Sequence, residues 1–363
     1  MSATNTTADP EIAAPRGFGR SLGLRIRRSD NVRTYVPLVL AILALGAYAS
    51  ANSDLFLTSR NINVLLDSVA VLGLITVGMT LLLIAGQIDL SVGAMATLSS
   101  VLAAKLIVGG SSDIVAIIAM VTVPVVIAML IGVIVVKTRV EPFMLTLGLL
   151  SVLQSVALIQ TGQRPVAVGS RLQSVDTTEI LGIPVSFWLF VAALVIGSLV
   201  LHFTRLGRNA YAVGSNQDAA FLSGVAVGRV KVAVFAISGF LVGVAGLLLL
   251  SSLGAGDAAA GAGLELDAIA AAVLGGASLL GGRGSMLGSF LGVMLLGVIS
   301  NSLTLLNVSS FYQRLVLGAL LMIAVVATAV AEKRRGSVES VGDVFKRWMG
   351  AKRSSAGTTK SSS

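Results

Sequence analysis

Gly86-Gln87-Ile88-Asp89-Leu90-Ser91-Val92-Gly93 places one carboxylate between two long apolar segments, with a glycine at each end. A charged side chain at the centre of a bilayer costs about 2.5 to 3.5 kcal/mol even on a lenient insertion scale. Asp89 therefore lies in a break between two helices or has a partner inside the membrane. Both interpretations indicate a membrane protein with a polar interior, and so a transport function.

The composition places most of the chain in lipid. Of its 363 residues, 55% are hydrophobic and only 12% are charged, whereas a soluble domain carries roughly 25% charged residues. The absence of cysteine excludes thiolate metal sites, and the single histidine, His202, argues against a histidine-based metal or catalytic cluster. The net charge of +9 does not indicate nucleic-acid binding, because the basic residues gather in the tails and short loops, as membrane topology requires. We expect no catalytic residue, no metal and no cofactor.

The apolar segments predict the architecture. A spanning helix needs about 20 mostly apolar residues. We expect about ten transmembrane helices, over residues 34–52, 64–85, 90–108, 114–136, 142–161, 184–203, 231–253, 265–281, 286–305 and 311–331. The sequence thus predicts an all-α membrane protein, with the Asp89 turn between its second and third helices.

The basic residues predict the orientation, because cytoplasmic loops are rich in Lys and Arg. The Arg-rich segment before Tyr35 is expected in the cytoplasm, and it is too long for the basic region of a cleaved signal peptide. Alternation then puts the loop 204–230 and the C-terminal tail inside as well. We therefore expect a disordered basic tail over 1–33, a permease domain over 34–331 and a basic, Ser-rich tail over 332–363, with both termini cytoplasmic.

The inner loop 204–230 has the features of a short helix. Asn216 is a good helix N-cap, and Gly224 is well placed to end the helix. Small side chains between them, at Ala219 and Ala220, would let such a helix fit a groove of another protein. A plain surface loop is the alternative, and the composition alone does not separate the two.

Three acidic residues in apolar surroundings are candidates for a polar pathway. Glu265 and Asp267 open a predicted helix on the outer side, where carboxylates favour the positive end of the helix dipole. Asp89, with Ser91, can satisfy the amides that a helix break leaves free. We favour this structural role for all three acids over contact with a passing polar solute, which is the alternative.

No motif in the chain supplies energy. The chain has no Gly-x-x-x-x-Gly-Lys-Ser/Thr phosphate loop. The glycine-rich runs at Gly275-Gly276 and Gly281-Gly282-Arg283-Gly284 are typical of close helix packing or a tight turn. Energy for transport is therefore expected from a partner or from an ion gradient.

Several ordered motifs resemble those of one family, the permease subunits of bacterial ABC importers for monosaccharides of the ribose, xylose and galactose type. The resemblance covers roughly residues 61–331. It rests on Gly86-Gln87-Ile88-Asp89-Leu90-Ser91-Val92-Gly93, Glu141-Pro142-Phe143-Met144-Leu145-Thr146-Leu147-Gly148, Gly263-Leu264-Glu265-Leu266-Asp267-Ala268-Ile269-Ala270-Ala271 with Leu274-Gly275-Gly276, Leu279-Leu280-Gly281-Gly282-Arg283-Gly284, and Ser309-Ser310-Phe311-Tyr312-Gln313. The chain departs from the family at Gln87, which replaces a glycine, and Glu141 adds polarity beside a second motif.

The resemblance implies a type II-like importer permease in the bacterial inner membrane, which moves a monosaccharide by alternating access and catalyses no covalent step. It implies a homodimer, an ATP-binding subunit inside and a periplasmic sugar-binding protein outside, with lipid around the helices. The short inner helix would be the coupling helix that docks on the ATP-binding subunit, because a helix seated in a groove is a common recognition mode. The residues implied in coupling are Gly214, Asn216, Ala219, Ala220, Ser223 and Gly224, and those implied at the pathway or helix break are Gly86, Asp89, Ser91, Gly93, Glu265 and Asp267.

Three other functions remain as alternatives. An importer permease for branched-chain amino acids or another small metabolite is the nearest, although the motifs around Asp89 and Glu265 favour sugar. An ion-coupled secondary transporter would need ionisable residues in mid-helix, and those found, Asp67, Lys105 and Arg314, stand near the ends of predicted spans. A membrane scaffold without transport does not explain the broken helices.

Overall fold

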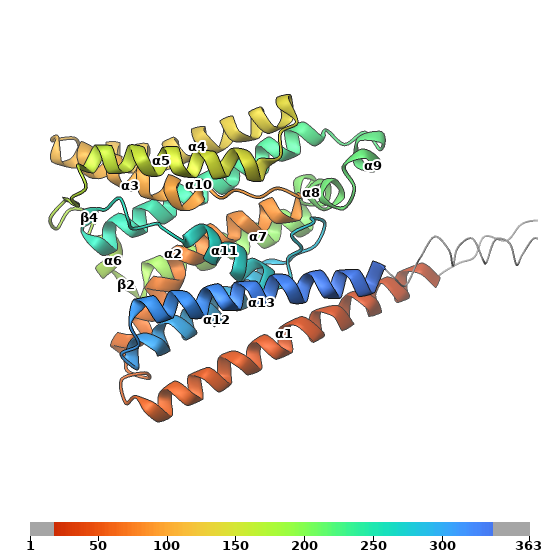
Figure 1. The fold of residues 1–363 in the computed structure, drawn as a ribbon, viewed down its shortest axis with the longest axis horizontal. Helices are drawn as coiled ribbons and strands as arrows, with labels where there is room; N and C mark the ends of the chain where they lie inside the picture. The colour runs from red at the N-terminus through yellow and green to blue at the C-terminus, as the bar shows by residue number, and fades with distance from the viewer. Residues whose placement is uncertain (1–17, 337–363) are drawn as a thin grey trace, which may run out of the picture.

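The computed structural model describes residues 18–336 as a bundle of helices that run roughly along one direction (Figure 1). The helices are α1 (Phe18–Asn52), α2 (Ser59–Ile84), α3 (Val92–Val108), α4 (Asp113–Thr138), α5 (Pro142–Thr161), α6 (Ser174–Thr177), α7 (Val185–Phe203), α8 (Arg205–Ser215), α9 (Gln217–Leu222), α10 (Val227–Leu253), α11 (Leu264–Leu274), α12 (Met286–Leu305) and α13 (Ser310–Gly336). The remaining residues of the two expected tails, 1–17 and 337–363, lie outside this description. Helix α1 begins within the segment expected as the N-terminal tail.

Each of the ten predicted spans contains a helix, but the helices differ in length. Among the described residues, seven are long and apolar enough to cross a membrane: the part of α1 from Tyr35 to Asn52, and α2, α4, α5, α7, α10 and α12. Helix α3 has 17 residues, and the apolar part of α13 runs over Ser310–Ile323. Helix α11 has 11 residues, ends at Leu274 rather than 281, and rises only about 16 Å. It ends there because Gly275 and Gly276 follow, and Gly276 adopts φ 91°.

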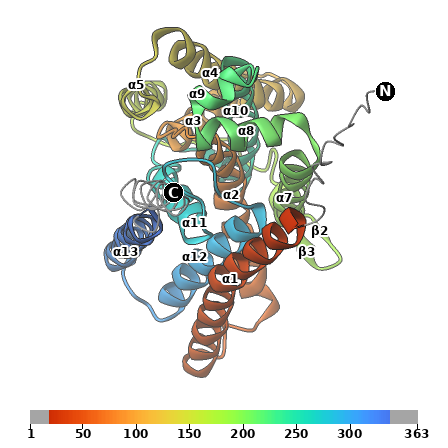
Figure 2. The ribbon, with the colours of Figure 1, turned by 90° about the vertical axis from the view of Figure 1, so that its right-hand side faces the viewer.

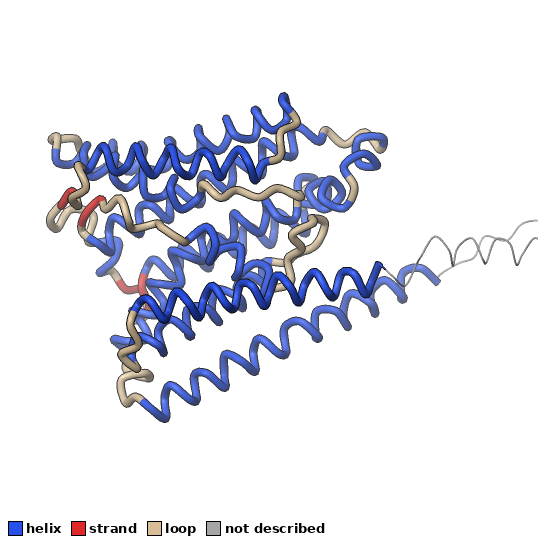
Figure 3. The backbone as a smooth tube through the Cα atoms, in the orientation of Figure 1, coloured by secondary structure: helices blue, strands red, loops and turns tan. Residues whose placement is uncertain are grey.

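The two ends of the bundle differ (Figure 3). The short strands gather at one end, where β1 (Val166–Ala167) pairs with β4 (Ala255–Gly256) and β2 (Glu179–Ile180) pairs with β3 (Ile183–Pro184), both antiparallel. Helices α8 and α9 lie at the opposite end. We call these the strand end and the α9 end.

Two four-helix units of the chain, α2 to α5 and α10 to α13, pack in the same pattern. In the first, α3 packs against α4 and α5, and in the second, α11 packs against α12 and α13. The units also exchange contacts, because α3 packs on α10 while α11 packs on α2. The views along and across the bundle place α4 and α5 at one edge and α12 and α13 toward the other, where α1 packs outside α12 (Figures 1 and 2).

The second unit is inverted relative to the first. Helix α2 finishes at the α9 end, where its last residue contacts the loop that follows α11, whereas α10 finishes at the strand end, beside β4. Inverted repeats of this kind are common in transporters. The sequence showed no such duplication, because repeated packing does not require repeated side chains.

The centre of the bundle is formed by α2 and α3. Residues 73–85 and 89–101 are buried without interruption, so the second half of α2 and most of α3 are covered on every face by protein. A helix that is apolar all round and so covered is a core helix. By contrast, α4, α5 and α7 expose many large apolar side chains, as helices facing lipid do.

Candidate functional site

The break between α2 and α3 spans residues 85–91 and lies inside the protein. Gly86 adopts φ 69°, which ends α2 by turning the chain away from the helical path. The extended chain then runs from the α9 end toward the middle of the bundle, where α3 starts (Figure 3). Non-helical backbone at this depth is tolerated because it is buried in protein and finds hydrogen-bond partners there.

Asp89 lies in this break, just before α3. Its side chain is 0% exposed, and its Oδ1 atom accepts hydrogen bonds from the Ser91 backbone N–H at 2.8 Å and from the Ser91 hydroxyl at 2.5 Å. These contacts fix the turn just before α3. The Oδ2 atom is buried and has no hydrogen-bond partner among the described residues. One carboxylate oxygen therefore holds Ser91, and the other is left over.

Thr146 of α5 also holds the break in place by hydrogen bonding. This residue was not identified from the sequence. Its hydroxyl is buried, accepts from the Leu90 backbone N–H at 3.1 Å and donates to the Pro142 carbonyl at 2.9 Å. One hydroxyl therefore joins the break to the first turn of α5. The only signal in the sequence was its place in the run that starts at Glu141.

A second break, over residues 254–263, precedes α11 and runs along α3. The Gly261 N–H donates to the Thr97 hydroxyl at 2.9 Å, and a Cβ on Gly256 would lie 2.9 Å from the Cα of Val101. The extended segment therefore passes down α3 from the strand end toward the start of that helix. Helices α3 and α11 thus both begin near the middle of the bundle.

Glu265 and Gly93 meet where these two helices begin. The Glu265 carboxylate lies where a side chain on Gly93 would stand, so only glycine fits there. Glu265 is half-buried, and its Oε1 accepts from the Gly263 N–H at 3.3 Å. Asp267 is half-buried two residues further along α11 and interacts electrostatically with Arg314 of α13. The acids were expected on the outer side; they lie deeper, beside the first turn of α3, because the extended segment comes before α11.

The short inner helix predicted from sequence is α9. The Asn216 side chain caps it by accepting from the Ala219 N–H at 2.9 Å, and Gly224 follows it with φ 81°. Ala220 is buried, whereas Ala219, Ser223 and the two apolar side chains Phe221 and Leu222 are exposed. In this six-residue helix 69% of Phe221 and 85% of Leu222 are exposed.

The predicted residues form four groups. Gly86 and Gly214 lie together, with the Cα of Gly214 3.5 Å from the place of a Cβ on Gly86. Gly93, Glu265 and Asp267 lie together where α3 and α11 begin, and Asp89 with Ser91 lies between Gly86 and Gly93 in the chain. The exposed residues of α9 form the fourth group, and this helix lies at the α9 end (Figure 1). Within residues 18–336, no three His, Asp or Glu side chains are placed to hold a metal ion.

Comparison with known proteins gives a consistent result. Residues 61–325 match the family described as the branched-chain amino acid transport system permease component. The ribose import permease RbsC of Bacillus subtilis is 41% identical over 299 residues, which cover 82% of this chain and 93% of that protein. RbsC of Escherichia coli is 37% identical over 79% of this chain and 91% of its own length. The L-arabinose ABC transporter permease AraH of Azospirillum brasilense is 34% identical over 93% of this chain and 97% of its own length. No solved structure matches the chain.

Proposed function

Because the chain belongs to the family of the branched-chain amino acid transport system permease component, we infer that it is the membrane permease subunit of a bacterial ABC importer, and that its substrate is a monosaccharide. The observation that carries the sugar assignment is the identity of 37–41% to ribose import permeases over nearly their whole length. A ribose-like pentose is the favoured substrate. The chain is a multi-pass protein of the inner membrane.

The permease acts with partners. An ABC importer permease works with an ATP-binding subunit and a substrate-binding protein, so energy comes from ATP hydrolysis outside this chain. We propose that two copies of the chain pair around a central pathway, with lipid against the exposed apolar faces of α4, α5 and α7. Transport is then alternating access, a two-state equilibrium that the partners bias from each side.

Helix α9 is the proposed coupling helix. Its exposed apolar residues at the end of the bundle support docking into a groove of the ATP-binding subunit. The positive-inside rule supports a cytoplasmic position for this end, because it carries Lys137, Arg139, Arg208, Arg229 and Lys231. We propose that Gly214 transmits movement of α8 and α9 to the break after α2, because the backbones of α8 and the break touch at this glycine.

The two breaks are the proposed gates. Broken helices of inverted repeats surround the substrate site in several transporter folds. Here each half helix, α3 and α11, crosses together with its extended segment, which supports a count of ten crossings when α13 is included. Both termini are then cytoplasmic. Glu265 and Asp267 face the region where the half helices start, and we propose that they border the pathway.

Uptake in cells tests the proposal. Cells with and without the chain are given labelled pentoses, hexoses and leucine. Loss of one sugar on deletion, with recovery on re-expression, is the expected result and names the substrate. Loss of leucine uptake with every sugar unchanged would move the chain to the amino-acid branch that the family description names. Normal uptake of all of them would overturn the importer assignment.

A further inference from the structure

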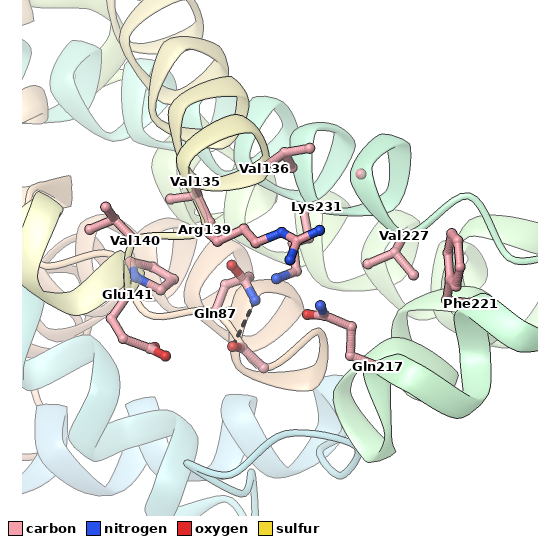
Figure 4. Close-up of a pocket in the computed structure, with 13 residues that line it drawn as sticks. Gln87, Val135, Val136, Arg139, Val140, Glu141, Gln217, Phe221, Val227 and Lys231 are labelled. Carbon is pink, nitrogen blue, oxygen red and sulfur yellow. Dashed lines mark hydrogen bonds between the residues drawn. The ribbon is translucent and has the colours of Figure 1, made fainter.

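A cavity of about 470 Å³ opens at the α9 end, between the break after α2 and helix α9, and the proposed function gives it no role. We call it the junction pocket, because five segments meet there: the break after α2, the end of α4, the start of α5, helix α9 and the start of α10. It is lined by Gly86, Gln87, Val135, Val136, Arg139, Val140, Glu141, Pro142, Gln217, Phe221, Val227, Gly228 and Lys231 (Figure 4). Its volume is in the range of small-molecule sites.

Two cations face this pocket without a partner. Figure 4 shows the guanidinium of Arg139 and the ammonium of Lys231 pointing into the same space. Arg139 follows the last residue of α4, and Lys231 lies near the start of α10. Neither forms a hydrogen bond or ion pair within residues 18–336. Glu141 lines the pocket as well and interacts with Lys231 electrostatically, but no ion pair joins them. The pocket therefore carries a net positive charge that a bound anion would neutralise.

Gln87 adds a hydrogen-bond acceptor to the pocket. Its side chain is only 4% exposed, and its Nε2 donates to the Gly86 carbonyl at 2.8 Å. Its buried Oε1 accepts no hydrogen bond from any described residue. A buried acceptor without a hydrogen-bond partner is destabilising, so a ligand that donates a hydrogen bond to it gains affinity. This is also the position at which the break motif departs from the signature it resembles.

We propose that the junction pocket binds a phosphate ester that carries hydroxyl groups, with Arg139 and Lys231 holding the phosphate and the Gln87 side chain accepting a hydrogen bond from a hydroxyl. A bare anion would satisfy the two cations and leave the Gln87 oxygen unpaired. A neutral sugar would donate a hydrogen bond to the Gln87 oxygen and leave the charges of the two cations uncompensated. The combination of both sets of groups selects a molecule with phosphate and hydroxyls together, and Gln217 and Glu141 offer further polar partners at the rim (Figure 4).

Two sources have this chemistry. One is a soluble sugar phosphate, and the other is the glycerol phosphate headgroup of phosphatidylglycerol. The pocket lies at the basic end of the bundle, where either can arrive under the proposed orientation.

The place of the pocket gives its ligand a means to regulate transport. Gln217 and Phe221 belong to α9, while Gly86 and Gln87 belong to the break, so one ligand would tie these two elements together. This consequence rests on the proposed function of α9. Binding itself does not, because it depends only on the residues of the pocket.

Binding is measured with the full-length chain in lipid nanodiscs. In phosphatidylcholine discs, labelled ribose 5-phosphate is titrated, with inorganic phosphate and ribose as competitors. A second set of discs contains phosphatidylglycerol, and native mass spectrometry counts the lipid that stays bound. Saturable binding of ribose 5-phosphate that ribose does not displace supports a soluble ligand. If phosphatidylglycerol displaces ribose 5-phosphate and about one lipid stays bound per chain, the ligand is the lipid headgroup.

Substitutions in the pocket complete the test. Arg139→Gln and Lys231→Gln should each weaken binding about tenfold or more, because each removes a charge-assisted hydrogen bond. Gln87→Leu should weaken the affinity for ribose 5-phosphate and leave the affinity for inorganic phosphate unchanged. Lys137→Gln is the matched control, since Lys137 is an exposed cation near Arg139 that does not line the pocket.

Three results would overturn the proposal. They are no binding of either the soluble ester or the lipid, equal affinity for ribose 5-phosphate and inorganic phosphate, and unchanged binding in both Arg139→Gln and Lys231→Gln. The thermal transition of each variant is recorded, so that a loss of fold is separated from a loss of ligand. Because sugar uptake is not the readout, a failed importer assignment would leave this result intact.

Discussion

Gly214, near the end of α8, lies directly against Ile84, the last residue of α2, so that a Cβ on Gly214 would overlap the Ile84 carbonyl oxygen. The same carbonyl accepts a hydrogen bond from the Gly282 N–H at 2.9 Å. Three segments that are far apart in the sequence thus meet at one backbone oxygen. Movement of α8 toward α2 is blocked here by the backbone of Ile84.

Replacement of Gly214 by alanine should destabilise the protein. The added methyl group must push α8 away from a backbone atom, which cannot rotate aside as a side chain can. Overpacking of this kind costs about 1–3 kcal/mol or more. The measurement is the thermal transition of the detergent-solubilised protein, followed by size-exclusion chromatography.

Gly318→Ala on α13 is the control for this substitution. A Cβ there meets nothing within 4 Å, so this variant should keep the wild-type transition temperature. Equal transition temperatures for wild type and Gly214→Ala would show that α8 can move away from Ile84 at no cost.

Asp89→Ala should lower the amount of folded protein more than it changes the apparent KM for uptake. The substitution leaves the Ser91 N–H and hydroxyl without their acceptor at a fully buried place, at a cost of about 1–3 kcal/mol. Folded protein is measured as the monodisperse peak in size-exclusion chromatography, and KM by uptake of the labelled sugar.

Asp89→Asn separates the two possible roles of this residue. Asparagine keeps one oxygen for Ser91, so it should recover most of the folded protein. If instead both variants fold fully and the KM rises strongly, Asp89 touches the substrate.

Ala219→Glu should abolish uptake while the protein remains folded in the membrane. Ala219 is exposed on α9, so a larger side chain meets no part of this chain, yet it would stand in the proposed contact with the ATP-binding subunit. Ala219→Ser, a change of one atom at the same place, should transport normally. The readouts are uptake and the ATPase rate of the complex, and full coupling in Ala219→Glu would remove α9 from the docking surface.

Asn61 and Asn301 should behave as one unit. They exchange two hydrogen bonds, at 3.0 and 2.9 Å, between α2 and α12. Each single change to alanine leaves the other amide short of a partner, so the double variant should be less destabilised than the sum of the two. Polar pairs between membrane helices average about 0.6 kcal/mol of coupling. Strictly additive transition temperatures would show that the pair contributes nothing.

Local chemistry allowed several elements to be predicted from the sequence. The places of the helices follow from apolar runs, and the end of α2 follows from Gly86 and Asp89, because a bilayer tolerates neither a free charge nor free backbone groups. The cap of α9 by Asn216 and its end before Gly224 are also local, since they involve residues within four positions of each other.

The sequence could not predict contacts between distant segments. Thr146 and Thr97 read as ordinary membrane threonines, and only packing turns them toward Leu90 and Gly261. The contact of Glu265 with Gly93 could not be predicted, because the non-helical segment before α11 carries no apolar signal that would show it inside the protein.

Hydrophobicity, charge and capping act within one segment of chain, and they are enough to define a polytopic membrane protein with a broken helix at Asp89. Packing between distant segments inverts the two four-helix units, brings α8 onto the carbonyl of Ile84 and places Gln87, Arg139 and Lys231 around one pocket. These relationships depend on which faces pack together and how closely. That choice is made by the shapes of many side chains at once, and no single stretch of sequence contains it.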